Sequence, residues 1–256
     1  MKILRIYTWA LIAMLYIPVA LIVALSFNDS KLPYIWGGFT YKWYLALFQW
    51  EQAWQALFNS FVIALAVSLV ATLLGVFMAY VLRSDKYLAI SQGAVVMPEI
   101  SEALAFAAAL WLVKTYVGVD LFGPVGVFLA HLAYTLPMAH VLLTPYIAYV
   151  GKSVVEASRI LGASEMKTVA FVILPILMPA FIATFLIVFV NSFDTYIKTA
   201  FTTSPGFITA PILLWNYAAR GRGDPTIYAL ATLMLVPSIA AAVIYFRAIK
   251  RYSLSP

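Results

Sequence analysis

The sequence predicts an all-α integral membrane protein with six transmembrane helices, and three observations support this fold class. Of the 256 residues, 64% are hydrophobic and only 10% are charged, whereas a soluble domain usually carries about 25% charged residues. The mean hydropathy is +0.97, a value at which lipid rather than water must cover much of the surface. Six apolar segments are each long enough to cross a bilayer, which takes about 20 residues.

The first apolar segment is preceded by Lys2 and Arg5, a pattern that also begins a signal peptide. Its apolar run is longer than a signal peptide needs, and Ala24 and Ser26 form a weak cleavage site. A start-transfer helix is therefore the preferred interpretation. The six predicted spans are approximately Thr8–Phe27, Phe58–Leu82, Gly93–Val117, Leu121–Pro145, Val169–Phe193 and Tyr228–Arg247.

The distribution of basic residues predicts that both termini are cytoplasmic, because cytoplasmic loops carry an excess of Lys and Arg. The N-terminus, the 83–92 loop, the 146–169 loop and the C-terminus hold Lys2, Arg5, Arg83, Lys86, Lys152, Arg159, Lys167, Arg247, Lys250 and Arg251. The opposite side holds only Lys31, Lys42, Lys114, Lys198, Arg220 and Arg222. The net charge of +6 is thus better explained by residues flanking the membrane than by nucleic-acid binding.

Two outer segments are more than simple connections. Residues 28–57 contain Trp36, Trp43, Trp50 and Trp54, which predicts an aromatic belt at the membrane interface. Within it we expect a short helix over Lys42–Trp50, lying on the membrane. The 194–227 stretch is moderately apolar and interrupted by Pro and Gly, which favours a partial re-entry into the membrane followed by a polar turn at Arg220–Pro225.

The 146–169 loop predicts a compact helical elbow at the cytoplasmic surface. Ser153 can cap a short helix with Glu156 as its capping-box partner, and Gly162 supplies the turn that ends it. Ser164 can then cap the helix that becomes the fifth span, which Pro175 and Pro179 should bend. Such an elbow suits docking into a groove of a soluble partner. An ordinary helical connection is the alternative interpretation.

The spacing within this elbow resembles the EAA loop of ABC importer permeases. That pattern is Glu-Ala-Ala, three residues, Gly, nine residues and Ile-x-Leu-Pro, and it is matched here by Glu156, Ala157, Ser158, Gly162, Val172, Leu174 and Pro175. Ser158 and Val172 are mild departures. The resemblance implies a coupling helix that fits a cleft on an ATPase subunit. Residues Glu156, Ala157, Ser158, Gly162 and Ala163 would form this ATPase-coupling loop.

The same resemblance implies the architecture and the partners of the chain. It implies the type I, MetI-like fold, with residues 1–57 as the first span and external loop, 58–248 as a five-helix permease core and 249–256 as a basic cytoplasmic tail. It further implies a second permease subunit, two ATPase subunits, an extracytoplasmic solute-binding protein and a location in the cell (inner) membrane. ATP hydrolysis would belong to the partner, since this chain has no Gly-x-x-x-x-Gly-Lys-Ser/Thr loop.

A further set of short matches resembles the spermidine/putrescine branch of these permeases. The matching pieces are Leu15–Pro18, Ser26–Asn28, Lys42–Tyr44, Met97–Ile100, Ser192–Asp194 and Ala229–Thr232. That branch usually has a second acid where this chain has Thr195, and an apolar residue where this chain has Lys198. A polyamine-like organic cation is the first substrate expectation. A phosphonate, metal ion, amino acid or sugar remains an alternative.

Three acids are the candidate residues of a translocation path or gate. Glu99 and Glu102 lie one helical turn apart in the third span, and a charge inside the bilayer costs about 3 kcal/mol unless it faces water or a partner. They therefore either line the path or lie near the cytoplasmic interface. Asp194 and Lys198 are four residues apart at the outer end of the fifth span. They either pair with each other or form an external gate.

The sequence predicts no metal site, no cofactor and no catalytic centre. His131 and His140 lie nine positions apart, on nearly opposite faces of one predicted helix, so packing or a local hydrogen bond is the better interpretation. The chain contains no cysteine, which excludes disulfides, thiolate metal sites and a cysteine nucleophile. An ion-coupled carrier that works without an ATPase and a membrane-bound enzyme or scaffold are the rival hypotheses.

Overall fold

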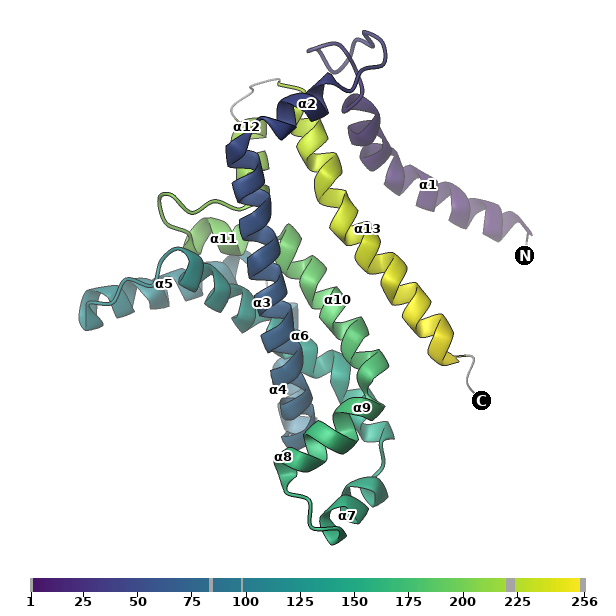
Figure 1. Cartoon of the computed structure of the whole chain (residues 1–256), viewed down its shortest axis with the longest axis vertical. Coiled ribbons are helices and arrows are strands. Elements are labelled where there is room, and N and C mark those ends of the chain that lie inside the picture. The colour runs from purple at the N-terminus through teal and green to yellow at the C-terminus, as the bar shows by residue number, and fades with distance from the viewer. Residues whose placement is uncertain (1, 83–84, 98, 220–223, 254–256) are drawn as a thin grey trace.

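The computed structural model describes residues 2–82, 85–97, 99–219 and 224–253, and within them the one β pairing is an isolated bridge between Asn28 and Phe39. Figure 1 shows an elongated helical molecule with α2 at one end and α7 and α8 at the other. The elements are α1 (Lys2–Leu25), α2 (Lys42–Phe48), α3 (Glu51–Val81), α4 (Asp85–Val96), α5 (Glu99–Val117), α6 (Pro124–Tyr149), α7 (Lys152–Ile160), α8 (Glu165–Thr168), the π-helical turn η1 (Val169–Ile173), α9 (Leu174–Ile176), α10 (Met178–Asp194), α11 (Ile197–Thr202), α12 (Ala210–Ala219) and α13 (Thr226–Ser253).

Helices α3, α6 and α10 pack against one another at the centre of the molecule. Small side chains allow this, since Ala64, Ala71 and Ala139 are fully buried on the contact surfaces. Gly75 marks the closest approach, because a Cβ atom there would lie 2.8 Å from the Cβ of Ala139. Membrane helices associate through such close packing, since lipid provides no hydrophobic driving force between them. A larger residue at position 75 would push α3 and α6 apart.

The all-α membrane fold predicted from composition is confirmed. In the described part of the chain, five helices are long and apolar enough to cross a membrane, and the count is six if one bent pair forms a single span. The first, second, fourth and sixth predicted spans correspond to α1, α3, α6 and α13. Helix α13 continues to Ser253, so the predicted tail is helical from residue 249 to that point, and residues 254–256 lie outside the described residues.

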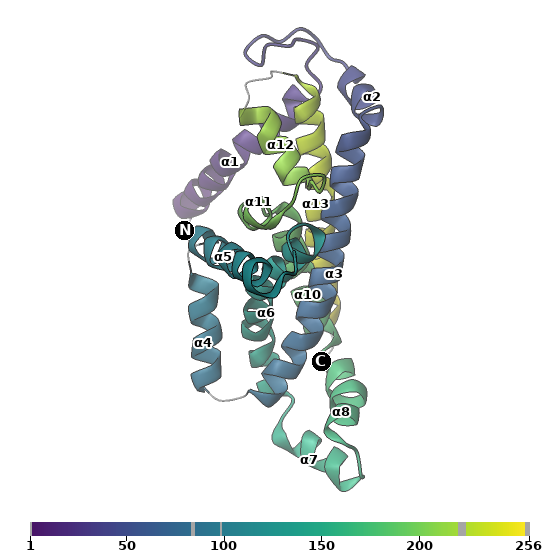
Figure 2. The same ribbon diagram turned by 90° about the vertical axis from the view of Figure 1, so that its left-hand side faces the viewer.

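The third predicted span, Gly93–Val117, is wrong as one continuous helix. The chain forms α4, which ends at Val96, and α5, which begins at Glu99. Figure 2 shows α4 running along the length of the molecule and α5 crossing it. Pro98 lies outside the described residues, but its chemistry accounts for the break, because proline has no N–H and disfavours helical geometry in the residue before it. Only α5 is long enough to be a candidate span.

The fifth predicted span is strongly bent, as its prolines led us to expect. The segments Glu165–Ile176 and Met178–Asp194 meet at an angle of 84°. Pro175 lies in the three-residue helix α9, and Pro179 lies in the first turn of α10. Proline removes a backbone hydrogen bond and crowds the preceding turn, and η1 loosens the helix directly before it. The bend turns the chain from the elbow into the core.

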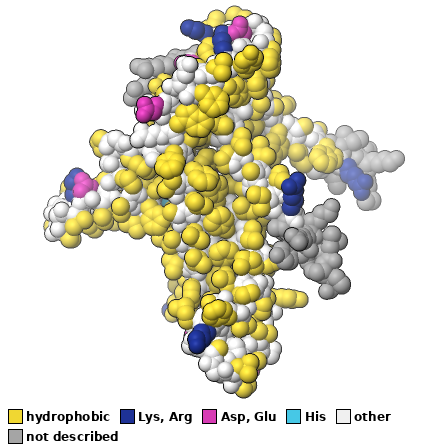
Figure 3. Space-filling model, in the orientation of Figure 1, with side chains coloured by type: hydrophobic (Ala, Val, Ile, Leu, Met, Phe, Trp, Pro, Cys, Tyr) yellow, Lys and Arg dark blue, Asp and Glu magenta, His cyan; other side chains and the backbone are white. Residues whose placement is uncertain are grey.

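Apolar side chains cover most of the visible surface, as Figure 3 shows, and charged groups gather near its extremities. Helix α1 is the most exposed of the candidate spans, since no residue in its most apolar 18-residue stretch is buried. It packs against α13, and in Figures 1 and 2 it leans away from the central helices. An apolar helix that is exposed all round needs lipid or another protein around it.

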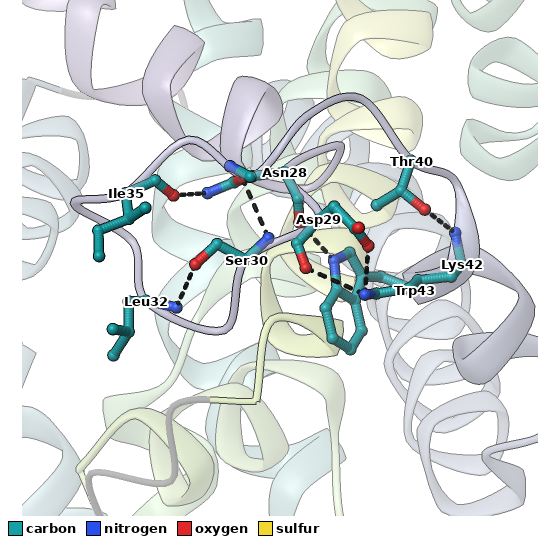
Figure 4. Close-up of polar contacts among 9 residues, drawn as sticks. Asn28, Asp29, Ser30, Leu32, Ile35, Thr40, Lys42 and Trp43 are labelled. Atoms are coloured by element: carbon teal, nitrogen blue, oxygen red, sulfur yellow. Dashed lines mark hydrogen bonds and ion pairs between the residues drawn. The ribbon is translucent and has the colours of Figure 1, made fainter.

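The loop between α1 and α2 is held by a local polar network, shown in Figure 4. The Asn28 side chain donates to the Ile35 carbonyl at 2.8 Å, and the Trp43 indole N–H donates to the Asn28 carbonyl at 2.7 Å. Lys42 pairs with Asp29. The predicted short helix is confirmed as α2, and Trp43 is buried beneath the loop. Trp43 therefore anchors this loop rather than belonging to an exposed aromatic belt.

Candidate functional site

The elbow consists of α7, a turn and α8, at one end of the molecule (Figure 1). Gly162 adopts φ +81°, which only glycine takes without strain, and so ends α7 as predicted. The Ser164 hydroxyl accepts a hydrogen bond from the Lys167 N–H, which confirms the predicted cap of α8. The predicted capping box is wrong. Helix α7 begins two residues earlier than that cap requires, with Gly151 at the N-cap and no side-chain cap, so Ser153 lies inside the helix.

Side-chain contacts tie the two arms of the elbow together. The Arg159 guanidinium lies 2.6 Å from a Glu165 carboxylate oxygen, and the Tyr80 hydroxyl of α3 donates to the other oxygen. The hydrogen bond to Tyr80 and the charge of Glu165 raise the pKa of Arg159 further above its ordinary value, so the guanidinium stays charged. The buried Ser158 hydroxyl shares a hydrogen bond of 2.9 Å with Thr168. These contacts join α7 to both α8 and α3.

The outer surface of the elbow is apolar at its tip. Ile160 and Leu161 are each 86% exposed, and Ala157 and Glu156 are exposed beside them on α7. Ala163 is half-buried, and its N–H bonds the Ser158 carbonyl at 3.0 Å. A cavity of about 660 Å³ lies on the inner side, between α3 and the elbow, and Glu156 is among its lining residues. The predicted coupling residues thus occupy one projecting structure with an uncovered apolar tip.

A second cavity, which we call the polar cavity, lies between the start of α5 and the helices α6, α10, α11, α12 and α13. Its volume is about 760 Å³. Its ionisable and aromatic lining residues are Glu99, Asp194, Lys198, Tyr134, Tyr196 and Trp215. The bend in the fifth span and the return of the chain through α11 and α12 bring these residues together. The predicted candidates Glu99 and Asp194 therefore share one site, whereas Glu102 is absent from the lining.

The predicted pairing of Lys198 with Asp194 is wrong. The Lys198 ammonium lies 2.9 Å from a Glu99 carboxylate oxygen, and the Thr195 hydroxyl donates to the same oxygen at 2.7 Å. The ammonium also lies 3.7 Å from the centre of the Tyr134 ring. Helix α11 begins after a break at Thr195, so the four-residue spacing of a continuous helix no longer holds. The break directs Lys198 towards α5 instead.

Asp194 has a different environment from Glu99. It is exposed, it accepts a hydrogen bond of 3.2 Å from the Ser238 hydroxyl of α13, and it forms no ion pair with any residue that the structure describes. The rings of Tyr196 and Trp215 lie nearby in the lining, 5.2 Å apart. Aromatic faces and an unpaired carboxylate are the groups that attract an organic ammonium.

Both histidines form hydrogen bonds, but with residues of other helices and not with local partners. His131 is buried and bonds Ser192 at 2.8 Å and Thr199 at 2.9 Å, which ties α6 to α10 and α11. His140 bonds Ser91 of α4 at 2.7 Å. Among the described residues, no group of three or more metal-ligating side chains is close enough to hold a metal ion.

Sequence reasoning missed Tyr134, Tyr196 and Trp215 as lining residues. Aromatic residues are abundant in this chain, at 16%, so their identity alone did not separate them from core or lipid-facing positions. The proximity of Tyr196 to Asp194 in sequence was the one available signal. Tyr134 and Trp215 come from distant segments and are brought in only by the fold.

Comparison with known proteins agrees with this architecture. Residues 71–253 match the family model described as the binding-protein-dependent transport system inner membrane component. The chain is 30% identical to the spermidine/putrescine transport system permease protein PotC of Haemophilus influenzae, over 93% of both chains. It is also 30% identical to the putrescine transport system permease protein PotI of Escherichia coli K12, over 86% of this chain and 81% of the relative.

Two solved structures have the same fold. A bacterial ABC transporter involved in the import of the acidic polysaccharide alginate matches all of this chain and 95% of its own, with a TM-score of 0.68 and 15% identity. The inward-facing MetNI methionine ABC transporter matches 78% of this chain and 93% of its own, with a TM-score of 0.59 and 17% identity. The MetI-like fold is thereby confirmed, and the five or six candidate spans among the described residues agree with it. This chain belongs to the binding-protein-dependent transport system inner membrane components, and it is a permease subunit of an ABC importer.

Proposed function

We propose that this subunit forms, together with a second permease, the path of a small organic cation of the polyamine type. The observation that carries the substrate class is the polar cavity, where Asp194 has no ion-pair partner among the described residues and lines the same cavity as the rings of Tyr196 and Trp215. A carboxylate with adjacent aromatic faces suits an ammonium group and disfavours an anion. The names of the relatives PotC and PotI support the same class.

The elbow is the proposed docking site of the ATPase subunits, which supply the ATP hydrolysis. Glu156, Ala157, Ser158, Gly162 and Ala163 form or support its surface. The exposed tip at Ile160 and Leu161 would be covered by the groove of the partner, since a helix with an apolar face docks in this way. Two such elbows, one from each permease, would engage two ATPase subunits.

This assignment orients the molecule in the inner membrane. The elbow end is cytoplasmic, and α13 runs from the opposite end towards it (Figure 1), so the C-terminus is also cytoplasmic. The N-terminus is proposed to lie on the same side, because the excess of Lys and Arg marks that side as cytoplasmic. The solute-binding protein would then dock at the end that carries α2 and the 28–41 loop. Residues 1–57 remain the proposed first span and external loop, and 58–248 the proposed permease core, although α3 begins before this boundary, at Glu51.

A continuous path of helices connects the elbow to the polar cavity. Closure of the ATPases would move α7, and the contacts of Arg159 and Ser158 would pass the movement to α8. The chain continues through η1 and the 84° bend into α10, whose last residue is Asp194. A change of the bend therefore displaces the carboxylate that faces the solute. Such switching requires two discrete arrangements that ATP and solute stabilise to different extents.

A panel of solutes tests the proposed substrate class. The purified complex of both permeases, the ATPases and the binding protein is reconstituted into liposomes, and ATP-driven uptake is measured for putrescine, spermidine, maltose and alginate oligosaccharides. We expect uptake of the amines and none of the neutral or acidic sugars, because only the amines carry an ammonium group for Asp194. Uptake of a sugar without uptake of either amine would refute the proposed substrate.

A further inference from the structure

Lys198 places a cation of the protein itself inside the polar cavity. Its side chain is only 5% exposed, although lysine is rarely buried unless it is paired. The ammonium lies 2.9 Å from Glu99 and 3.7 Å from the centre of the Tyr134 ring. Both partners come from helices remote in sequence, so this arrangement is built by the fold and is not a local ion pair.

The two partners of Lys198 are the groups that would otherwise bind an ammonium of the solute. A carboxylate provides a charge-assisted hydrogen bond, and the face of a tyrosine ring attracts a cation within about 6 Å. The Thr195 hydroxyl also donates to the same Glu99 oxygen at 2.7 Å. One oxygen of Glu99 and the face of Tyr134 are therefore already occupied by groups of the protein, and the charge of Glu99 is paired with Lys198. Asp194 lines the same cavity as Tyr196 and Trp215. No basic residue that the structure describes forms an ion pair with it.

We propose that Lys198 is a tethered ammonium that fills one of two cation subsites in the polar cavity and so determines specificity. The filled subsite is formed by Glu99 and Tyr134, and the open subsite by Asp194 with its neighbouring rings. The cavity then holds one ammonium group of the solute and leaves no subsite for a second one. Lys198 thus removes the advantage that a second ammonium group would give a diammonium solute over a monoammonium solute of equal length. This inference rests on the proposed function, since it assigns the charge of the transported cation.

Replacing Lys198 with Met tests the inference, because Met keeps the volume and length of the side chain and removes its charge. ATP-driven uptake is measured for putrescine and for 4-amino-1-butanol, which has the same chain length and one ammonium group. The readout is the putrescine-to-aminobutanol ratio in the variant divided by the ratio in the wild type, so any preference of the binding protein cancels. We expect this quotient to rise about tenfold, as one gained charge-assisted hydrogen bond allows.

Two further variants keep the test specific. Lys114→Met removes a lysine that pairs with Asp120 at 2.7 Å outside the polar cavity, and it should leave the ratio unchanged. The double variant Glu99→Gln/Lys198→Met removes the Glu99 carboxylate as well as the Lys198 ammonium. Because no carboxylate is then left to bind a second ammonium group, the ratio should stay near that of the wild type. If Lys198→Met fails to assemble, Lys198→Gln keeps a hydrogen-bond donor to Glu99 without the charge and should raise the ratio.

An assembled, transporting Lys198→Met or Lys198→Gln complex with the ratio of the wild type would overturn the inference and leave the proposed function intact. An equal rise in the Glu99→Gln/Lys198→Met variant would also overturn it, because the new subsite would not then contain Glu99. If the wild-type complex takes up neither amine, the proposed substrate class fails, and the inference fails with it.

Discussion

Replacing Gly162 with Arg should reduce ATP-driven uptake by about 5- to 150-fold, the range produced by losing a coupling free energy of about 1–3 kcal/mol. Gly162 has φ +81° at the turn of the elbow, and no other atom lies within 4 Å of the position where a Cβ would stand. The arginine side chain would therefore project into the space that we propose for the docked ATPase. The measurement is solute uptake together with ATP hydrolysis in the same proteoliposomes. We expect uptake to fall while the subunit remains in the membrane.

Gly118 provides a matched control for backbone strain. It has φ +77°, and here too the position that a Cβ would take has no atom within 4 Å, but Gly118 follows α5 and lies outside the elbow. In both positions the positive φ should cost a non-glycine residue about 1–2 kcal/mol. Gly118→Arg should therefore share the loss of stability and retain uptake. Equal uptake by Gly162→Arg and the wild type would exclude the elbow as the coupling site.

Replacing Asp194 with Asn should weaken the apparent affinity for the transported amine by about 10- to 100-fold, because a hydrogen bond to a charged group contributes about 1.5–3 kcal/mol. Asparagine has nearly the same shape and can still accept the hydrogen bond from Ser238. The change therefore removes the negative charge of the open subsite with little effect on packing. The measurement is the dependence of ATP-driven uptake on amine concentration.

Asp120→Asn is the corresponding control outside the polar cavity. This variant also removes one negative charge at an exposed site, but Asp120 is paired with Lys114, whose hydrogen bond lowers the pKa of the Asp120 carboxyl. It should leave the affinity for the amine unchanged. An equal loss of affinity in both variants would show that the loss of any negative charge on the outer surface weakens amine binding, and that Asp194 has no specific role. No loss in Asp194→Asn would exclude this carboxylate from binding the solute.

Features that depend on local chemistry were predictable from the sequence. The length of the apolar segments predicted the membrane fold, and the spacing from Glu156 to Pro175 predicted both the elbow and the family. Gly162 and Ser164 have the expected roles because positive φ and helix capping are decided by a few neighbouring atoms. The prolines of the fifth span predicted a bend, although its angle of 84° also depends on the packing of α10.

Features that depend on tertiary contacts were not predictable in the same way. Lys198 was expected to pair with Asp194, four residues away, because a continuous helix would place them together. The chain breaks at Thr195, and Lys198 instead meets Glu99, which lies 99 residues earlier at the start of α5. The length of the apolar run also predicted one span over Gly93–Val117, because the run continues across Pro98. Hydrophobicity alone does not locate such a break, and the missing N–H of proline was the stronger signal.

Omission of single subunits tests the central claim most directly. Proteoliposomes are prepared with this chain, the second permease, the ATPase and the binding protein, and in parallel without the ATPase, and uptake of the amine is measured with ATP inside. We predict uptake in the complete system and its loss when the ATPase is omitted. Undiminished uptake by the permeases without the ATPase, driven by an ion gradient, would contradict the account and make the chain part of an ion-coupled carrier.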